Sequence, residues 1–202
     1  KQLDYLIIKK KNIKLGSIQE LLTGKRRLEG FEKKHGTKQS EFDIIPKDWE
    51  IKIMSKTGCF INGVNKAKED YGHGCLHVNI NNIFESFSIV PAKLDRVNVT
   101  KKEIKTYALQ KGDVCILRSS VKPEGVGYPA LFEGNNNPVV FSGFIIRFRP
   151  CPIWDSTYLT FLLRSKFMRN IVISKSTISA NTNINQKALG SILILLPPFP
   201  EQ

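Results

Sequence analysis

The sequence predicts an α+β fold, in which helices pack on a curved sheet of mixed or antiparallel strands and one further helix projects at the N-terminus. Two observations support this prediction. Apolar residues recur with helical spacing in residues 3–23 and again after residue 155, whereas residues 49–150 contain short apolar runs broken by turn residues. The sequence contains no repeat with a period of 20–50 residues, which argues against a solenoid.

The first predicted helix has an apolar stripe that is interrupted by the lysines at 9–11, and Gly24 is well placed to end it. A helix of this kind needs a partner surface to be stable. Two interpretations follow: the helix lies on its own domain, or it is exposed and pairs with another helix. In the second interpretation the subunit contacts are made by Leu3, Leu6, Ile13, Ile18 and Leu21.

The composition of the chain suggests three segments. Residues 1–32 form the helix and its basic end, residues 33–48 form a polar linker with Gly36, Ser40 and Pro46, and residues 49–202 form the main domain. The first residue is Lys1 rather than methionine, so we expect a processed product, a fragment or a designed chain.

Within the main domain, the prediction alternates short strands with a few helices. Thr100 and Glu103 have the spacing of a capping box, and Asp155 or Ser156 is placed to begin an amphipathic helix that reaches Val172. The predicted strands lie at 59–61, 76–80, 87–90, 96–99, 114–118, 128–133, 139–148 and 192–196. Of the four cysteines, Cys59, Cys75 and Cys115 lie in apolar, strand-like runs and are predicted to be small buried residues.

The chain is strongly basic, with a formal net charge of +13 and a pI near 9.7. Residues 1–38 alone carry a net charge of +7. A polyanionic partner is the natural interpretation, and an inert basic surface is the alternative. Since no run approaches 18 consecutive apolar residues and no signal core is present, we expect a cytoplasmic protein with no membrane partner.

The sequence lacks a motif for catalysis. No phosphate-binding loop or nucleophile elbow is present, and Gly125-Val126-Gly127 lacks the third glycine of a dinucleotide site. A nuclease site around Asp113 and Glu124 would lack a third acidic or lysine residue at a diagnostic spacing, and Asp113 fits a turn better. The cysteines and histidines show no metal-ligand spacing, so we predict no catalytic site, metal or cofactor.

Four polar segments remain, and their side chains suit the reading of duplex DNA. Arginine and lysine bind guanine edges or phosphates, asparagine binds adenine edges, and serine and threonine bind either. Each segment taken alone is also typical of a solvated turn. The candidate DNA-binding residues are Lys66, Lys68, Asn79, Asn81, Asn82, Arg118, Ser119, Lys122, Lys175, Ser176, Thr177, Ser179, Asn181 and Asn183.

The ends of the chain resemble a known family. The run Leu196-Pro197-Pro198-Phe199-Pro200-Glu201-Gln202 resembles the L-P-P-x-x-E-Q signature of Type I restriction–modification specificity subunits, and residues 184–189 resemble the approach to it. Residues 21–28 resemble the end of the family's central conserved helix, and Ile45-Pro46-x-x-Trp49 resembles the entry to its second recognition domain. The internal runs 109–114 and 158–163 also fit the family's pattern.

The resemblance implies a target-recognition domain that reads one half of a split double-stranded DNA target and has no active site of its own. It implies modification subunits as partners, which methylate adenine, and through them restriction subunits, which hydrolyse ATP and cut. The chain then corresponds to the tail of the central helix and the second recognition domain. Two alternatives remain: the recognition domain of a fused adenine DNA methyltransferase, and a protein-interaction module that acts through the helix.

Overall fold

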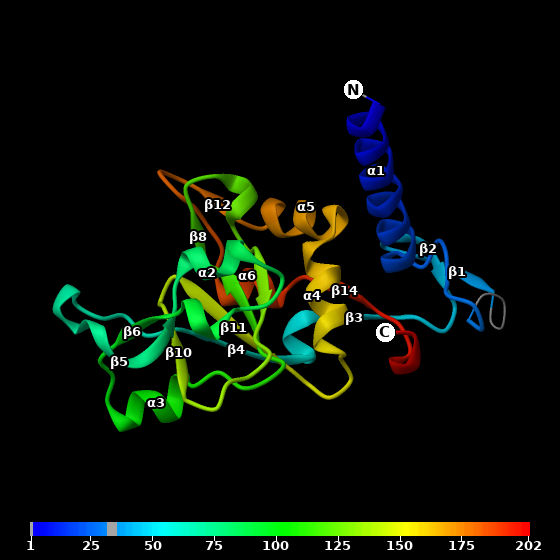
Figure 1. The fold of residues 1–202 in the computed structure, drawn as a ribbon. Helices are drawn as coiled ribbons and strands as arrows, with labels where there is room; N and C mark the ends of the chain where they lie inside the picture. The colour runs from blue at the N-terminus through cyan, green and yellow to red at the C-terminus, as the bar shows by residue number, and fades with distance from the viewer. Residues whose placement is uncertain (1, 32–35) are drawn as a thin grey trace.

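The computed structural model describes residues 2–31 and 36–202. A long helix, α1 (Gln2–Leu22), projects from one end of an α+β body, as Figure 1 shows. The helix ends where Gly24 adopts a φ of +72°, and the N–H of Arg26 donates to the carbonyl of Glu20. The predicted helix and its glycine cap are therefore confirmed.

The body is built from several small sheets rather than one large curved sheet. The central sheet has the order β4-β11-β7-β9, and every pairing in it is antiparallel. A second sheet is mixed, because β10 runs parallel to β5. The strands are β1 (Thr37–Ser40), β2 (Asp43–Pro46), β3 (Glu50–Ile53), β4 (Gly58–Asn62), β5 (Tyr71–Val78), β6 (Asp95–Val97), β7 (Val114–Leu117), β8 (Ser119–Ser120), β9 (Pro129–Leu131), β10 (Val139–Phe141), β11 (Ile145–Pro150), β12 (Thr177–Ile178), β13 (Thr182–Asn183) and β14 (Leu193–Leu196).

The central sheet is buried on both faces, and strand β7 shows why. Its four residues are all buried, and they alternate between two hydrophobic cores. Val114 and Ile116 pack into the core beneath α4 (Ser156–Arg164), α5 (Lys166–Ser174) and α6 (Gln186–Gly190). Cys115 and Leu117 face the other core, which includes Ile83 of α2 (Ile80–Glu85). The period-two alternation of a strand thus joins two layers of helices and strands.

The remaining helices begin at side-chain caps. Helix α3 (Lys101–Tyr107) starts at the predicted capping box, in which Thr100 and Glu103 bond to each other's backbone N–H. Helix α4 begins at Asp155, which accepts a hydrogen bond from the N–H of Tyr158. The single helix predicted after residue 155 is in fact two, because Ser165 leaves helical geometry and caps α5. Five short 3₁₀ turns occur among the described residues, at 54–56, 68–70, 91–93, 123–125 and 199–201.

A buried ionic network joins α1 to the body, and we call it the junction (Arg27, Asp48, Trp49 and Glu201). The Arg27 guanidinium donates two hydrogen bonds to Asp48 and two to Glu201, at 2.6–3.0 Å. The Trp49 indole N–H donates to the same Glu201 carboxylate at 2.8 Å. These bonds raise the pKa of Arg27 above its ordinary value, the bond to Glu201 being the largest cause. The junction therefore ties the end of α1 to the last residues of the chain.

The structure corrects several sequence-based expectations. The predicted strand 87–90 is irregular and makes only an isolated bridge from Ser88 to Leu131. The predicted strand 139–148 is two strands, separated by a turn at 142–144. Cys59 is exposed and Cys75 is half-buried, so only Cys115 is the buried residue that was predicted.

The predicted linker contains the hairpin β1–β2, in which Ile45 is buried against Trp49 and Leu195. A segment of high polarity can thus still pair with itself and contribute a buried residue. The predicted boundary between residues 32 and 33 lies outside the described residues, and the division into three segments stays a prediction.

Candidate nucleic-acid interface

Two of the four polar segments meet in one small sheet. Its order is β12-β13-β8, with Thr182 opposite both Ser120 and Ile178, and Asn183 opposite Ser119. We call this sheet, its adjoining residues and the two residues before β12 (118–122 and 175–183) together the β8 face. In Figure 1 it extends from the upper left of the body, away from the chain's C-terminus. Residues more than 60 positions apart in the sequence are thus brought into hydrogen-bonding register.

The backbone on both sides of Arg118 is fixed. Its N–H donates to the carbonyl of Phe144 at 2.8 Å, and its carbonyl accepts from the N–H of Ile184 at 2.9 Å. The guanidinium itself makes a long contact of 3.5 Å with the carbonyl of Gly143. A rigid backbone with a weakly held guanidinium suits a side chain that must reach a ligand.

The polar segment around Asn79–Asn82 lies beside the β8 face and forms the start of helix α2. Asn79 caps α2, and Asn82 reaches back to the N–H of Asn79 in a reciprocal capping box. Asn82 is buried, and its amide N–H also contacts the carbonyl of Lys93 at 3.4 Å. Asn81 is exposed on α2. Capping therefore accounts for Asn79 and Asn82, and Asn81 is the member of this set with a side chain open to solvent.

Close packing holds α2 against the β8 face. A Cβ on Gly125 would lie 2.2 Å from the Ser120 hydroxyl and 3.2 Å from the Phe84 ring, so this position requires glycine. Phe84 in turn packs on Tyr128, with ring centroids 5.4 Å apart. The polar segments around residues 80 and 120 are therefore held by a fixed contact.

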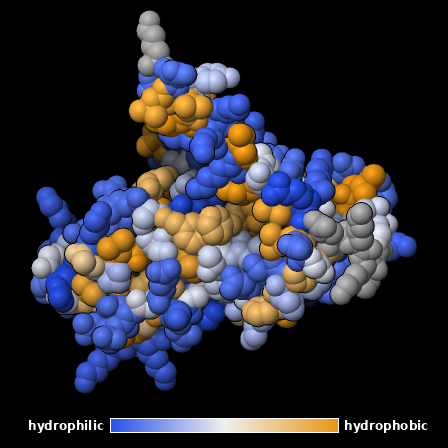
Figure 2. Space-filling view, turned by 45° about the vertical axis from the view of Figure 1, so that its right-hand side comes forward, coloured by the Kyte–Doolittle hydropathy of each residue, from blue (hydrophilic) through white to orange (hydrophobic). Residues whose placement is uncertain are grey.

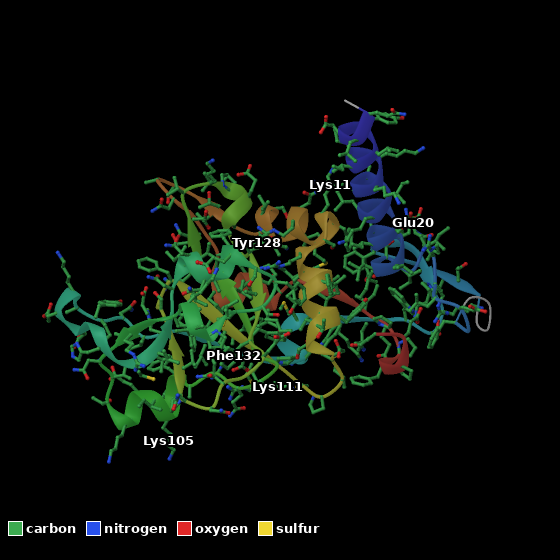
Figure 3. All side chains as sticks on the ribbon, viewed as in Figure 1. Lys11, Glu20, Lys105, Lys111, Tyr128 and Phe132 are labelled. Carbon is green, nitrogen blue, oxygen red and sulfur yellow. The ribbon has the colours of Figure 1, made fainter. Side chains whose placement is uncertain are left out.

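Two arginines support this contact from behind: Arg169 is buried, and Arg164 is half-buried. Arg164 of α4 lies over the Tyr128 ring at 4.7 Å and donates to the carbonyls of Ser86 and Pro129. Arg169 of α5 also faces Tyr128, and it donates to the carbonyls of Glu124 and Val126. Burial lowers the pKa of Arg169 to about 10. Figure 3 shows Tyr128 between α2 and α5 in that view.

The predicted residues on the β8 face differ in how far their side chains are used inside the molecule. Lys122, Lys175, Thr177, Ser179 and Asn181 are exposed. The hydroxyl of Ser176 donates to the carbonyl of Ile173, and the Asn183 amide donates to the carbonyl of Asn181. Ser119 is half-buried, like Ser176 and Asn183. The exposed members are the ones best placed to contact a ligand.

The polar segment that contains Lys66 and Lys68 lies only partly near the β8 face. Val64 bridges to Ser142, in the turn next to the β8 face, but Lys66 turns toward α3. Its ammonium group pairs with the Glu103 carboxylate at 2.9 Å, and the Lys66 side chain is 15% exposed. Lys68 is exposed. The two lysines predicted as equivalent therefore differ, because one already has a carboxylate partner.

Sequence reasoning missed the aromatic residues of this region. Phe84 and Phe144 are large, apolar and yet exposed, and both lie beside the β8 face. Phe144 had been placed inside a single long strand. The signal that could have revealed it is the pair Ser142-Gly143, since serine and glycine before an aromatic residue are typical of a turn.

The sequence-based nuclease alternative fails on geometry. Asp113 is buried and accepts two hydrogen bonds from Arg149 at 2.7 Å and one from the N–H of Gln110. Both oxygens of its carboxylate accept hydrogen bonds within the protein, which agrees with the prediction that Asp113 belongs to a turn. Among the described residues, no group of three or more histidine, cysteine or acidic side chains could hold a metal ion.

The predicted subunit-contact residues divide into two groups along α1. Leu3, Leu6 and Ile13 are exposed, at 68%, 47% and 58%. Ile18 packs against the core, and with Leu21 it lines a groove of about 390 Å³ between α1, α4 and the C-terminal residues. Figure 2 shows apolar surface on the part of the helix that projects from the body. No helix within the described ranges is long and apolar enough to cross a membrane.

Comparison with known proteins matches this arrangement to one family. The family model described as "Type I restriction modification DNA specificity domain" matches residues 9–202. The chain belongs to this family. A putative type I restriction enzyme MjaX specificity subunit from Methanocaldococcus jannaschii is 30% identical over 177 residues, which are 85% of this chain and 41% of that protein. The chain thus spans less than half the length of this curated relative, and the resemblance found in the sequence is confirmed.

Two solved structures share the fold of this specificity domain. The HsdS subunit from Thermoanaerobacter tengcongensis matches with a TM-score of 0.61 at 16% identity, over 99% of this chain and 43% of that one. A chain from a structure of the complex assembly and conformational transition of the type I R-M system gives 0.58 at 14% identity, over 99% and 46%. The predicted α+β class with a projecting helix is confirmed.

Proposed function

We propose that this specificity domain reads one half of a bipartite double-stranded DNA target for a Type I restriction–modification complex. The observation that carries the proposal is the meeting of separate polar segments on the β8 face of a chain with a net charge of +13. Membership of a family of DNA specificity domains supports it.

The side chains on the β8 face have different proposed roles. Arg118 and Asn181 read base edges, because arginine and asparagine match guanine and adenine in the major groove. Lys122 and Lys175 contact phosphates, with serine and threonine hydroxyls of the same face beside them. Asn81 and Lys68 lie at the edge of the proposed interface. We leave out Asn82, whose amide is buried, and give Asn79 a structural role as a cap.

Helix α1 serves assembly in this proposal. Its exposed part presents Leu3, Leu6 and Ile13, which an isolated helix would leave in water at a cost. We infer that a helix of the same specificity subunit covers them and that the assembled subunit positions the modification subunits, and through these the restriction subunits. The domain itself carries out no reaction in this scheme and needs no cofactor.

Selection from a pool of random DNA duplexes tests the DNA-reading function. The chain is incubated with the pool at low salt, where phosphate contacts are strongest, and the bound duplexes are sequenced. We expect one short motif to be enriched. This motif should match half of a split adenine-methylation pattern in the genome of the source strain. Retention of all duplexes alike, or of none, would overturn the proposal.

A matched variant separates DNA reading from assembly. Replacing Leu3, Leu6 and Ile13 by serine should leave the enriched motif unchanged, because these side chains lie on the projecting helix. The same variant should lose co-purification with the modification subunit of its own system. Loss of the motif would assign DNA reading to the helix, and unchanged co-purification would remove α1 from assembly.

A further inference from the structure

A hollow of about 690 Å³ opens between α2, the β8 face and the turn that joins β10 to β11. Its lining includes Phe84 from α2, Ser119 and Lys122 from the β8 face, Phe144 from the turn and Asn181 from the loop between β12 and β13. The hollow therefore lies where the polar segments meet, and it is continuous with the proposed interface.

The two phenylalanines of the hollow are held out of the cores by the backbone. The N–H of Phe144 donates to the Ser142 hydroxyl at 3.3 Å, and its carbonyl accepts from the N–H of Arg118 at 2.8 Å. Its side chain is 55% exposed, and that of Phe84 is 47% exposed. Since the Phe84 ring packs on Tyr128, the backbone of Phe144 is fixed and both rings are unburied, they offer an apolar surface to a ligand.

Hydrogen-bonding groups border this apolar surface. Within residues 2–31 and 36–202, the side chains of Ser119 and Asn181 make no hydrogen bond to the protein. Lys122 adds a positive charge at the rim, and Glu124 adds one negative charge. A phosphate group would fit poorly, because the floor is apolar. A ligand with both a methyl group and hydrogen-bonding edges matches the lining better.

We propose that the hollow receives the major-groove edge of an A·T base pair, with the C5 methyl group of thymine against Phe144 and Phe84. An A·T pair presents there a methyl group, an acceptor and the donor–acceptor edge of adenine that an asparagine amide can bind. Asn181 faces the adenine edge. This inference rests on the proposed DNA-reading function, and it makes the C5 methyl group of one thymine a required contact of the half-target.

The test replaces thymine by deoxyuridine, which removes only the methyl group. The duplex motif selected by the chain is synthesised with each thymine replaced singly, and the dissociation constants are measured. Burial of one methyl group predicts that at one position the replacement weakens binding by about 3- to 5-fold. The variant Phe144→Ala should bind the thymine and deoxyuridine duplexes equally.

A matched control variant excludes a general loss of apolar surface. Phe199 is 56% exposed, nearly the same as Phe144, but it lies in the C-terminal turn. Phe199→Ala should keep the full sensitivity to deoxyuridine. Circular dichroism of both variants should match the parent chain, because neither ring belongs to a buried core.

The outcomes separate this inference from the proposed function. A motif in which no deoxyuridine replacement weakens binding overturns the inference and leaves DNA reading intact. A Phe144→Ala variant that still discriminates thymine from deoxyuridine also overturns it, because the methyl group is then read elsewhere. Absence of any selected motif overturns the proposed function and the inference together.

Discussion

The junction and the β8 face both gather polar side chains, but they use them in opposite ways. At the junction, Arg27 retains only 8% of its side-chain exposure and binds two carboxylates. On the β8 face, Arg118 reaches one backbone carbonyl at 3.5 Å, and Lys122 is exposed. A charge with internal partners fixes the position of a helix, whereas a charge without them remains available to a ligand.

The largest expected effect comes from breaking the junction. Glu201→Ala removes one carboxylate from Arg27 and the acceptor of the Trp49 indole. Loss of one partner of a buried ion pair should lower the free energy of unfolding by about 3–5 kcal/mol. Urea unfolding measures it. The control is Glu85→Ala, whose pair with Lys93 is exposed and should contribute less than about 1 kcal/mol. Equal effects would mean that burial makes no difference here.

An arginine on the β8 face should affect DNA binding instead of stability. Arg118→Ala should weaken binding to the selected duplex by about 1–3 kcal/mol and relax the preference at one base position. Fluorescence anisotropy with the four single-base variants of each position measures this. Arg96→Ala is the control, because Arg96 of β6 donates to the carbonyl of Gly74 on β5 and is not part of the β8 face. Uniform weakening on all sequences would reduce Arg118 to a phosphate contact.

A smaller effect distinguishes two lysines that look alike in sequence. Lys66 already pairs with Glu103, whereas Lys68 is exposed. The salt dependence of DNA binding should therefore fall by about one unit of slope in Lys68→Ala and stay unchanged in Lys66→Ala. Binding measured at several salt concentrations gives both slopes. A fall of about two units in the double variant would return Lys66 to the interface.

The smallest effect is a local titration. Hydrogen bonds from the Thr100 backbone, and then the Lys66 ammonium, lower the pKa of Glu103 from 4.5 to about 2. The stabilisation from this carboxylate is fully present above pH 4.5 and is lost as the pH falls through about 2. Carboxyl chemical shifts measured by NMR follow the titration. Lys66→Ala should raise the pKa of Glu103, and Lys68→Ala should leave it in place.

Local features of the sequence predicted much of the fold. The helical stripe of residues 3–23, the cap at Gly24 and the Thr100–Glu103 box each depend on residues within a few positions of one another. The Asn79–Asn82 cap has the same spacing of three, and it was missed because the preceding alternation favoured a strand. Here two short-range signals compete, the strand alternation of residues 76–80 and the helix cap at Asn79. The prediction followed the alternation, which extends over more residues.

The candidate site depended on contacts that no local signal carries. Residues 119–120 pair with 182–183, and Arg27 binds Glu201 across 174 positions. Sequence composition drew attention to both polar segments of the β8 face, and the fold brings them together. It also shows which predicted residues already have partners inside the molecule, as Lys66 and Asn82 do.

The pairing of β3 with β14 has a consequence for how such domains can change. Glu50 lies opposite Leu196, and Ile53 lies opposite Leu193. The strand that follows the junction residues Asp48 and Trp49 therefore pairs with the strand that precedes Glu201. The residues between β3 and β14 form one segment whose two ends lie next to each other. Arg27, Asp48, Trp49 and Glu201 all lie outside this segment, so a different segment with the same two closing strands would leave the ionic junction in place. The fold thus separates the residues that hold α1 from the segment that contains the β8 face.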